Sequence, residues 1–209
     1  MTAIAPHISA FLLERLPVER RASPHTQDSY SYAFQLLFQF TSERLTIPPS
    51  ALHVEQIDAP LVLDFLNHLE RDRGNGASTR NVRLAAIKSF FRFIEYRVPS
   101  ALEQVRRILA IPPKKTEERL VSHLTVPEMK AVVAAPDPAT RDGIRDRAMI
   151  HMAFSAGLRV SELVGLRLND VSLDGTPSIL VRGKGRRERA LPLTQEGTQA
   201  LRAWCLFRP

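Results

Sequence analysis

The first half of the chain carries apolar side chains at helical spacing. They recur close to i, i+3 and i+4 between residues 10 and 97, and the alternation typical of a half-buried strand is missing. The spacing is seen in Phe34, Leu37, Phe38 and Leu45, and again in Leu61, Phe65, Leu66 and Leu69. Turn-forming residues break the pattern at Pro24, at Ile47–Ser50 and at Gly74–Ala77. The pattern therefore predicts a domain of four main helices.

A different composition follows between residues 98 and 117, where prolines are mixed with lysines. The segment includes Val98-Pro99 and Ile111-Pro112-Pro113-Lys114-Lys115. Proline lacks a backbone donor and interrupts both helix and sheet, and a charged linker extends because its charges repel. We therefore predict a helical domain over residues 1–97, an extended linker over 98–117 and a second domain over 118–209.

The second domain is predicted to mix helices with two short strands. Thr125 is the expected N-cap of its first helix, because Glu128 stands three residues later as in a capping box. The later elements are predicted as a helix over 141–154, a short helix over 160–166, strands on either side of Gly183-Lys184-Gly185, and a helix over 194–207. The predicted fold of the whole chain is thus mainly α.

Composition narrows the classes of partner. The net charge is +7 and the pI is about 10.2, which favours an anionic partner such as nucleic acid. Cys205 is the only cysteine, so no intramolecular disulfide or cysteine metal cluster is expected. No clustered ligand set or Walker-type loop is found, and we expect neither metal nor cofactor. No apolar run approaches the length of a membrane span, so we expect a cytoplasmic protein without membrane or small-molecule partners.

One candidate for phosphate chemistry is Arg159, within the run Ala153–Leu163. A guanidinium offers two parallel donors to the oxygens of a phosphate, and Gly157 allows the backbone to approach closely. Glu162, three residues later, is placed to orient or partly neutralise a nearby arginine. Taken alone, an arginine before a short amphipathic helix is more often a surface or capping residue.

The second candidate is the predicted hairpin around Lys184. Glycine at 183 and 185 permits a tight turn that projects the lysine. The basic side chains between residues 182 and 189 are Arg182, Lys184, Arg186, Arg187 and Arg189, against one acidic residue, Glu188. A solvated charged hairpin is the alternative interpretation of this segment.

In this order, the two motifs resemble the first part of the catalytic domain of tyrosine recombinases, the phage integrase family. The resemblance implies a helical SAM-like core-binding domain, followed by an incomplete α+β catalytic domain with a small antiparallel β hairpin. It implies that Arg159 binds a DNA phosphate and that Lys184 assists protonation of the leaving 5′-hydroxyl oxygen. It also implies double-stranded DNA as partner, a possible homo-oligomer on DNA, and no metal or nucleotide cofactor.

The resemblance extends to the helix expected over residues 79–93, which has one apolar face and basic residues beside it. Such a helix packs on one side and offers cations to DNA phosphates on the other. The residues we expect to contact the DNA backbone are Arg80, Arg83, Lys88 and Arg92 of this helix, together with Arg182, Arg186 and Arg187 of the hairpin.

The chain departs from the family after the hairpin. The family continues with a His-x-x-Arg box and a nucleophilic tyrosine, whereas all six histidines of this chain precede Arg159. Its three tyrosines are Tyr30, Tyr32 and Tyr96, and we expect them to pack in the helical domain. No nucleophile is therefore identified, and we expect a shortened chain that does not cleave DNA by itself.

Three hypotheses follow from the sequence. The first is the N-terminal part of a site-specific tyrosine recombinase or integrase. The second is a non-catalytic DNA-binding protein that occupies recombination sites or interferes with an intact recombinase. The third is an unrelated helical protein with incidental charge. The order of Arg159 and Lys184 favours the first.

Overall fold

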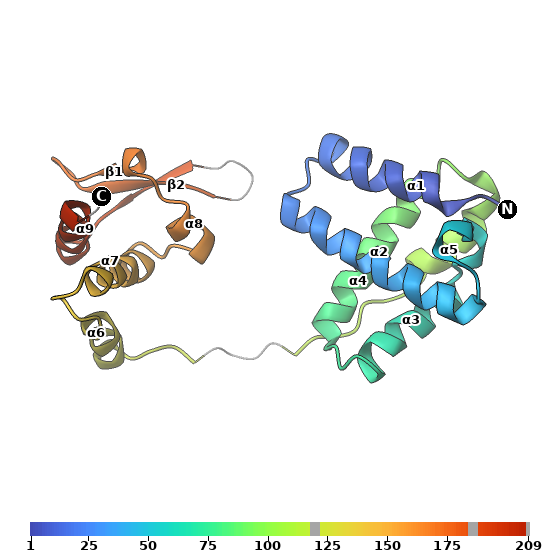
Figure 1. The fold of residues 1–209 in the computed structure, drawn as a ribbon, viewed down its shortest axis with the longest axis horizontal. Coiled ribbons are helices and arrows are strands. Elements are labelled where there is room, and N and C mark those ends of the chain that lie inside the picture. Colours follow the sequence, from blue (N-terminus) through green and yellow to red (C-terminus); the bar gives the residue numbers. More distant parts are fainter. Residues whose placement is uncertain (118–121, 184–187, 208–209) are drawn as a thin grey trace. The chain divides into compact units, whose positions relative to one another are not determined.

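The computed structural model describes residues 1–117, 122–183 and 188–207 (Figure 1). The chain divides into two compact units, Met1–Arg119 and Leu120–Pro209, here called the N-terminal and the C-terminal unit. Both are built mainly from helices, as the apolar spacing predicts. Within the described ranges, no helix is long and apolar enough to cross a membrane.

The N-terminal unit is a bundle of helices. Its elements are α1 (Ile4–Ala10), which continues as the π-helical segment Phe11–Glu19, then α2 (Pro24–Leu45), α3 (Ala59–Arg71), α4 (Ala77–Ile94) and α5 (Leu102–Ala110). The helix starts follow local chemistry, because Ser23 caps α2 and Asp58 caps α3 by accepting from backbone N–H groups of the first turn. The four helices predicted before residue 97 and the breaks between them are confirmed.

Phenylalanine rings form the centre of this bundle. Phe90 of α4 packs against Phe11 and Phe34, with ring centroids 5.5 and 5.4 Å apart. All three rings are almost completely buried. The apolar stripe of α4 thus faces helices that precede it in the chain, which explains why the sequence pattern of this segment is so regular.

The segment from residue 98 to residue 111 corrects a prediction. It was expected to be extended, but residues Leu102–Ala110 form α5. Val105 and Ile108 are fully buried in the core of the N-terminal unit, and Gln104 Nε2 donates to the carbonyls of Val54 and Ile57. Apolar residues three apart, flanked by prolines rather than interrupted by them, form a short amphipathic helix. The predicted linker therefore begins too early.

An extended segment follows α5 and is fastened to the bundle. Asn81 of α4 pairs with the backbone of Lys114, donating to its carbonyl at 2.7 Å and accepting from its N–H at 2.9 Å. The ammonium group of Lys114 also lies 2.7 Å from Glu70 of α3. The N-terminal unit therefore holds the chain as far as residue 114.

The C-terminal unit combines four helices with a three-stranded antiparallel sheet in its described part (Figure 1). Its elements are α6 (Val126–Ala134), α7 (Arg141–Ser155), α8 (Val160–Val164), β1 (Val171–Ser172), β2 (Ser178–Arg182), β3 (Glu188–Pro192) and α9 (Gln195–Phe207). The capping box of Thr125 and Glu128 is present. The two strands expected around Gly183 are confirmed, whereas the two-residue β1 was not predicted.

Sheet register places the ends of the hairpin strands opposite each other. Val181 pairs with Arg189, and Arg182 pairs with Glu188. Ile179 and Val181 point into a small core that also contains Met152 of α7 and Leu201 of α9. Because alternate residues of a strand face opposite sides, the register determines which basic side chains of the hairpin lie near α8.

Candidate nucleic-acid interface

Arg159 immediately precedes α8 and is the most exposed member of a charged cluster. Gly157, at φ +59°, turns the chain just before it, a conformation that glycine adopts without strain. The backbone N–H of Arg159 donates to Glu162 Oε2 at 2.9 Å, and its Nη1 donates to Oε1 at 3.1 Å. The side chain is nevertheless 74% exposed. The guanidinium is therefore held through one nitrogen, Nη1, and the rest of it is accessible to an anion.

Glu162 is the buried centre of the cluster, with a side chain that is 4% exposed. Arg189 of β3 donates Nη1 and Nη2 to the two carboxylate oxygens at 3.0 and 2.9 Å. These bonds, together with the backbone N–H of Arg159, lower the pKa of Glu162 from 4.5 to about 2. The role suggested for Glu162 by its spacing, contact with a nearby arginine, is confirmed and extends to a second arginine.

The low pKa of Glu162 predicts acid-sensitive stability. A carboxyl with a pKa of about 2 when folded, against the ordinary 4.5, binds protons more weakly in the folded than in the unfolded state. Its stabilising contribution is complete above pH 4.5 and is lost as the pH falls toward 2. Trp204, the single tryptophan, lies in α9 and reports unfolding of this unit. We expect the difference in urea midpoint between wild type and Glu162→Gln to shrink between about pH 5 and about pH 2.5; a constant difference would contradict the depressed pKa.

A second buried carboxylate repeats this arrangement at the other hairpin strand. Asp170, whose side chain is 5% exposed, accepts from the backbone N–H of Arg167 at 3.1 Å and from Arg182 Nη1. The bond from the Arg167 backbone is the main cause of its lowered pKa, followed by Arg182. Arg182 Nε also donates to Glu188 at 3.0 Å. Arg182, expected to contact DNA, is thus shared between two carboxylates.

The remaining predicted residues of the hairpin lie in the sequence between β2 and β3. Lys184, Arg186 and Arg187 lie outside the described residues, so their roles stay predictions. The structure does describe β2 and β3 on either side of these residues, and it links Arg182 of β2 to the buried Asp170 and Arg189 of β3 to the buried Glu162 of α8.

Arg80 corrects one of the predicted DNA contacts on α4. Its side chain is 5% exposed, with Nε 3.7 Å from Glu70 Oε2 and Nη1 3.2 Å from Asn81 Oδ1. The helical spacing placed it among the basic residues, but its position at the start of α4 turns it toward α3. Arg80 is therefore a structural residue of the bundle and not a surface contact.

The other three basic residues of α4 differ in how freely they are presented. Arg92 is exposed and Lys88 is half-buried, and burial, followed by repulsion from Arg92, lowers the pKa of Lys88. Arg83 lies over the ring of Tyr32, 4.8 Å from its centroid, and donates to the carbonyl of Ser29 at 3.1 Å. Arg92 is thus the most available cation of the predicted set on this helix.

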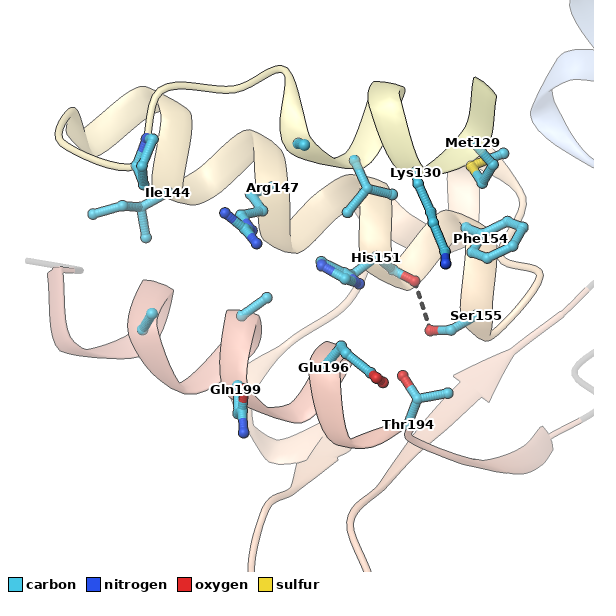
Figure 2. A pocket seen from close by; sticks show the side chains of 15 residues that line it. Met129, Lys130, Ile144, Arg147, His151, Phe154, Ser155, Thr194, Glu196 and Gln199 are labelled. Carbon is cyan, nitrogen blue, oxygen red and sulfur yellow. Dashed lines mark hydrogen bonds between the residues drawn. The ribbon is translucent and has the colours of Figure 1, made fainter. Parts of the chain in front are cut away.

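A separate cavity of about 730 Å³ lies between α6, α7 and α9 (Figure 2). Its titratable side chains are Lys130, Arg147, His151 and Glu196, among apolar walls. Burial lowers the pKa of His151, and Arg147 lowers it further, whereas Glu196 acts in the opposite direction. None of the predicted site residues is among the described lining, so we assign this cavity no part in the phosphate site.

Sequence reasoning missed the two pairs that anchor the hairpin. In the sequence, Arg189 is one of several basic residues of the hairpin, and no motif distinguishes Asp170. The available signal was a repeated spacing, because Arg159 and Glu162 are followed by Arg167 and Asp170, each an arginine with an acidic residue three positions later. The partner arginines on the strands, however, are found only in the folded structure.

Comparisons with known proteins cover both units. Residues 122–208 match the model of the phage integrase family, and residues 9–97 match that of the phage integrase N-terminal SAM-like domain. The putative integrase/recombinase y4rC of Sinorhizobium fredii is 44% identical, over 97% of this chain and 61% of the relative. A second protein of the same organism, the putative integrase/recombinase y4rD, is 40% identical to this chain, over 96% of this chain and 72% of y4rD. The chain thus spans 61% and 72% of the lengths of these two relatives.

More distant matches agree. Tyrosine recombinase XerC of Pelotomaculum thermopropionicum is 35% identical, over 95% of this chain and 63% of that protein. Among solved structures, XerH site-specific recombinase in a post-cleavage complex gives a TM-score of 0.66 at 21% identity, over 90% of this chain and 54% of that one. The Tn1549 transposon integrase gives 0.67 at 12% identity, over 100% and 66%; these two likenesses concern the fold. Both domain models and the curated relatives show that the chain belongs to the phage integrase family of tyrosine recombinases.

Proposed function

We propose that this chain is the DNA-binding and phosphate-holding part of a site-specific tyrosine recombinase. The observation that carries the proposal is Arg159, an exposed guanidinium that a buried carboxylate holds at one corner. Related proteins support a DNA partner, since the XerH structure contains its palindromic difH substrate and the Tn1549 integrase structure contains a circular intermediate DNA. Arg92, Lys88 and Arg83 of α4 are the proposed backbone contacts of the N-terminal unit.

The proposed chemistry follows from the charge that develops on a phosphodiester during transesterification. Negative charge gathers on the non-bridging oxygens, and a preorganised guanidinium stabilises it. Arg159 is proposed to supply these donors, and Lys184, by its family position, to assist protonation of the leaving 5′-hydroxyl oxygen. The phosphotyrosine chemistry of the family needs no metal or nucleotide cofactor, and the proposal includes none. Assembly as a homo-oligomer on DNA is part of the same proposal.

Strand cleavage needs a nucleophile in addition to these cations. The printed sequence has six histidines, all before Arg159, and three tyrosines, all before residue 97. We therefore propose that these 209 residues bind DNA without cutting it. On their own, these residues are proposed to occupy recombination sites and to compete for them with a recombinase that carries the nucleophile.

The test is DNA affinity as a function of salt. We expect the chain to shift duplex DNA at about 50 mM salt and to lose much of its affinity by about 200 mM, because phosphate contacts release counterions. Arg159→Ala is expected to weaken binding about tenfold and to reduce the salt slope by about one contact. Arg145→Ala is the control, since Arg145 is a half-buried arginine of the same unit already paired with Asp142 and Asp146. Absence of binding at low salt, or equal affinity of Arg159→Ala and wild type, would overturn the proposal.

A further inference from the structure

Glu162 is shared by two arginines in unequal ways. Its two oxygens accept four hydrogen bonds, two from Arg159 and two from Arg189. The bonds from Arg189 form a bidentate fork, at 3.0 and 2.9 Å. Of the Arg159 bonds, one comes from the backbone, and only Nη1 of the side chain reaches the carboxylate, at 3.1 Å. The carboxylate thus binds Arg189 as a fork and Arg159 at a single side-chain corner.

The two arginines also differ in how they are held. Arg189 lies on β3, where it pairs with Val181 of β2, and Val181 is 2% exposed in the core. Its side chain is 37% exposed, whereas that of Arg159 is 74% exposed. A strand anchored in the core brings Arg189 to Glu162 with its fork already aligned, and preorganisation of this kind reduces the entropy lost on pairing.

The arrangement creates a competition for one carboxylate. A buried carboxylate binds a guanidinium best in the bidentate geometry, and an unpaired buried charge is strongly unfavourable. Arg159 is three residues from Glu162 and already donates one bond. If Arg189 were removed, each carboxylate oxygen would lose the bond it accepts from Arg189 and could accept a second guanidinium bond from Arg159. The Arg159 N–H groups engaged in this way are the donors that a phosphate needs.

We propose that Arg189 is a positioning residue, which occupies Glu162 and thereby keeps the guanidinium fork of Arg159 available for a DNA phosphate. The inference rests on the proposed function of Arg159. It assigns Arg189 no contact with DNA, although Arg189 is one of the basic residues of the hairpin.

The test removes Arg189 and then removes the charge that would capture Arg159. Arg189→Gln is expected to weaken DNA binding about tenfold, as Arg159→Ala does, because Glu162 then binds the Arg159 fork. Adding Glu162→Gln in the same chain is expected to restore most of this loss, because a neutral amide holds a guanidinium weakly. A direct DNA contact by Arg189 predicts no recovery in the double variant, and that result would overturn the proposal. A purely stabilising pair also predicts recovery, because the double variant removes the unpaired buried charge, and the mobility of the Arg159 Nη groups in Arg189→Gln separates that role from capture.

Matched controls separate capture, meaning the binding of both Arg159 fork donors by Glu162, from the effects of a changed net charge and of unfolding. Arg107→Gln, alone and with Glu103→Gln, makes the same charge changes on an exposed pair of α5, and each variant is expected to alter affinity less than twofold. Should Arg189→Gln fail to fold, Arg189→Lys keeps the charge without the fork, and affinity is expected to fall about threefold. Wild-type affinity in a folded Arg189→Lys chain would overturn the role of the fork.

A second measurement needs no DNA. In nitrogen-15 NMR of the arginine side chains, the Nη groups of Arg159, held by one hydrogen bond in wild type, are expected to rotate more slowly in Arg189→Gln than in wild type. Unchanged rotation would refute capture even if DNA binding is lost. The opposite result is also possible: the Nη groups of Arg159 become restrained in Arg189→Gln, but Arg159→Ala leaves DNA affinity unchanged. That result would refute the proposed function, while the competition of the two arginines for Glu162 would still be supported.

Discussion

Replacing Phe90 with alanine is expected to lower the free energy of unfolding of the N-terminal unit by about 3–5 kcal/mol, the usual range for a buried phenylalanine. The ring is 1% exposed. It lies between 5.4 and 6.5 Å from the ring centroids of its four aromatic neighbours, Phe11, Phe34, Phe91 and Phe93. These neighbours come from three different elements, so a cavity at this point cannot be closed by moving one helix.

Helical circular dichroism during a urea titration measures this loss, while Trp204 fluorescence follows the C-terminal unit separately. The matched control is Tyr96→Ala, which also removes an aromatic ring from the N-terminal unit. Tyr96 is 85% exposed, so the packing expected for this tyrosine is wrong, and its removal is expected to change the stability by less than about 0.5 kcal/mol. A loss below about 1.5 kcal/mol for Phe90→Ala would mean that the aromatic centre repacks around the gap.

The helices could be predicted because their determinants are local. The apolar stripe of α4, the proline and glycine breaks and the Thr125 capping box each depend on residues within a few positions of one another. The same holds for the pair formed by Arg159 and Glu162, which stand three residues apart at the start of α8. These features can be predicted from the sequence because each depends only on residues that are close along the chain.

The features that escaped prediction depend on distant partners. The segment that forms α5 looked like a linker because of its prolines, and only its burial against the bundle shows otherwise. Basic residues of the hairpin looked alike in the sequence, yet Arg182 and Arg189 are each bound to a buried carboxylate of an earlier segment. Long-range ion pairs of this kind have no periodicity. The sequence therefore shows how many charged residues there are, but not which of them pair with one another.

The buried position of Arg80 predicts a large loss of stability when its acidic neighbour is removed. Glu70→Ala is expected to destabilise the N-terminal unit by about 3 kcal/mol, because it leaves the Arg80 charge buried without its carboxylate. The Arg80 side chain is 5% exposed and that of Glu70 is 19% exposed, with 3.7 Å between Nε and Oε2. The same substitution removes the carboxylate that holds the Lys114 ammonium at 2.7 Å, so the extended segment after α5 loses one of its attachments as well.

The control for this prediction is Glu103→Ala, which breaks a glutamate–arginine pair of the same unit with side chains 71% and 70% exposed; a change of at most about 0.5 kcal/mol is expected there. If burial of a lone charge is the cause, removing that charge must reverse the effect. Arg80→Met combined with Glu70→Leu is therefore expected to recover most of the stability lost in Glu70→Ala, since apolar replacement of a buried pair is often neutral. The double variant should also bind DNA as tightly as wild type, because a guanidinium enclosed between α3 and α4 does not reach a phosphate. Weaker DNA binding by a fully stable double variant would return Arg80 to the interface.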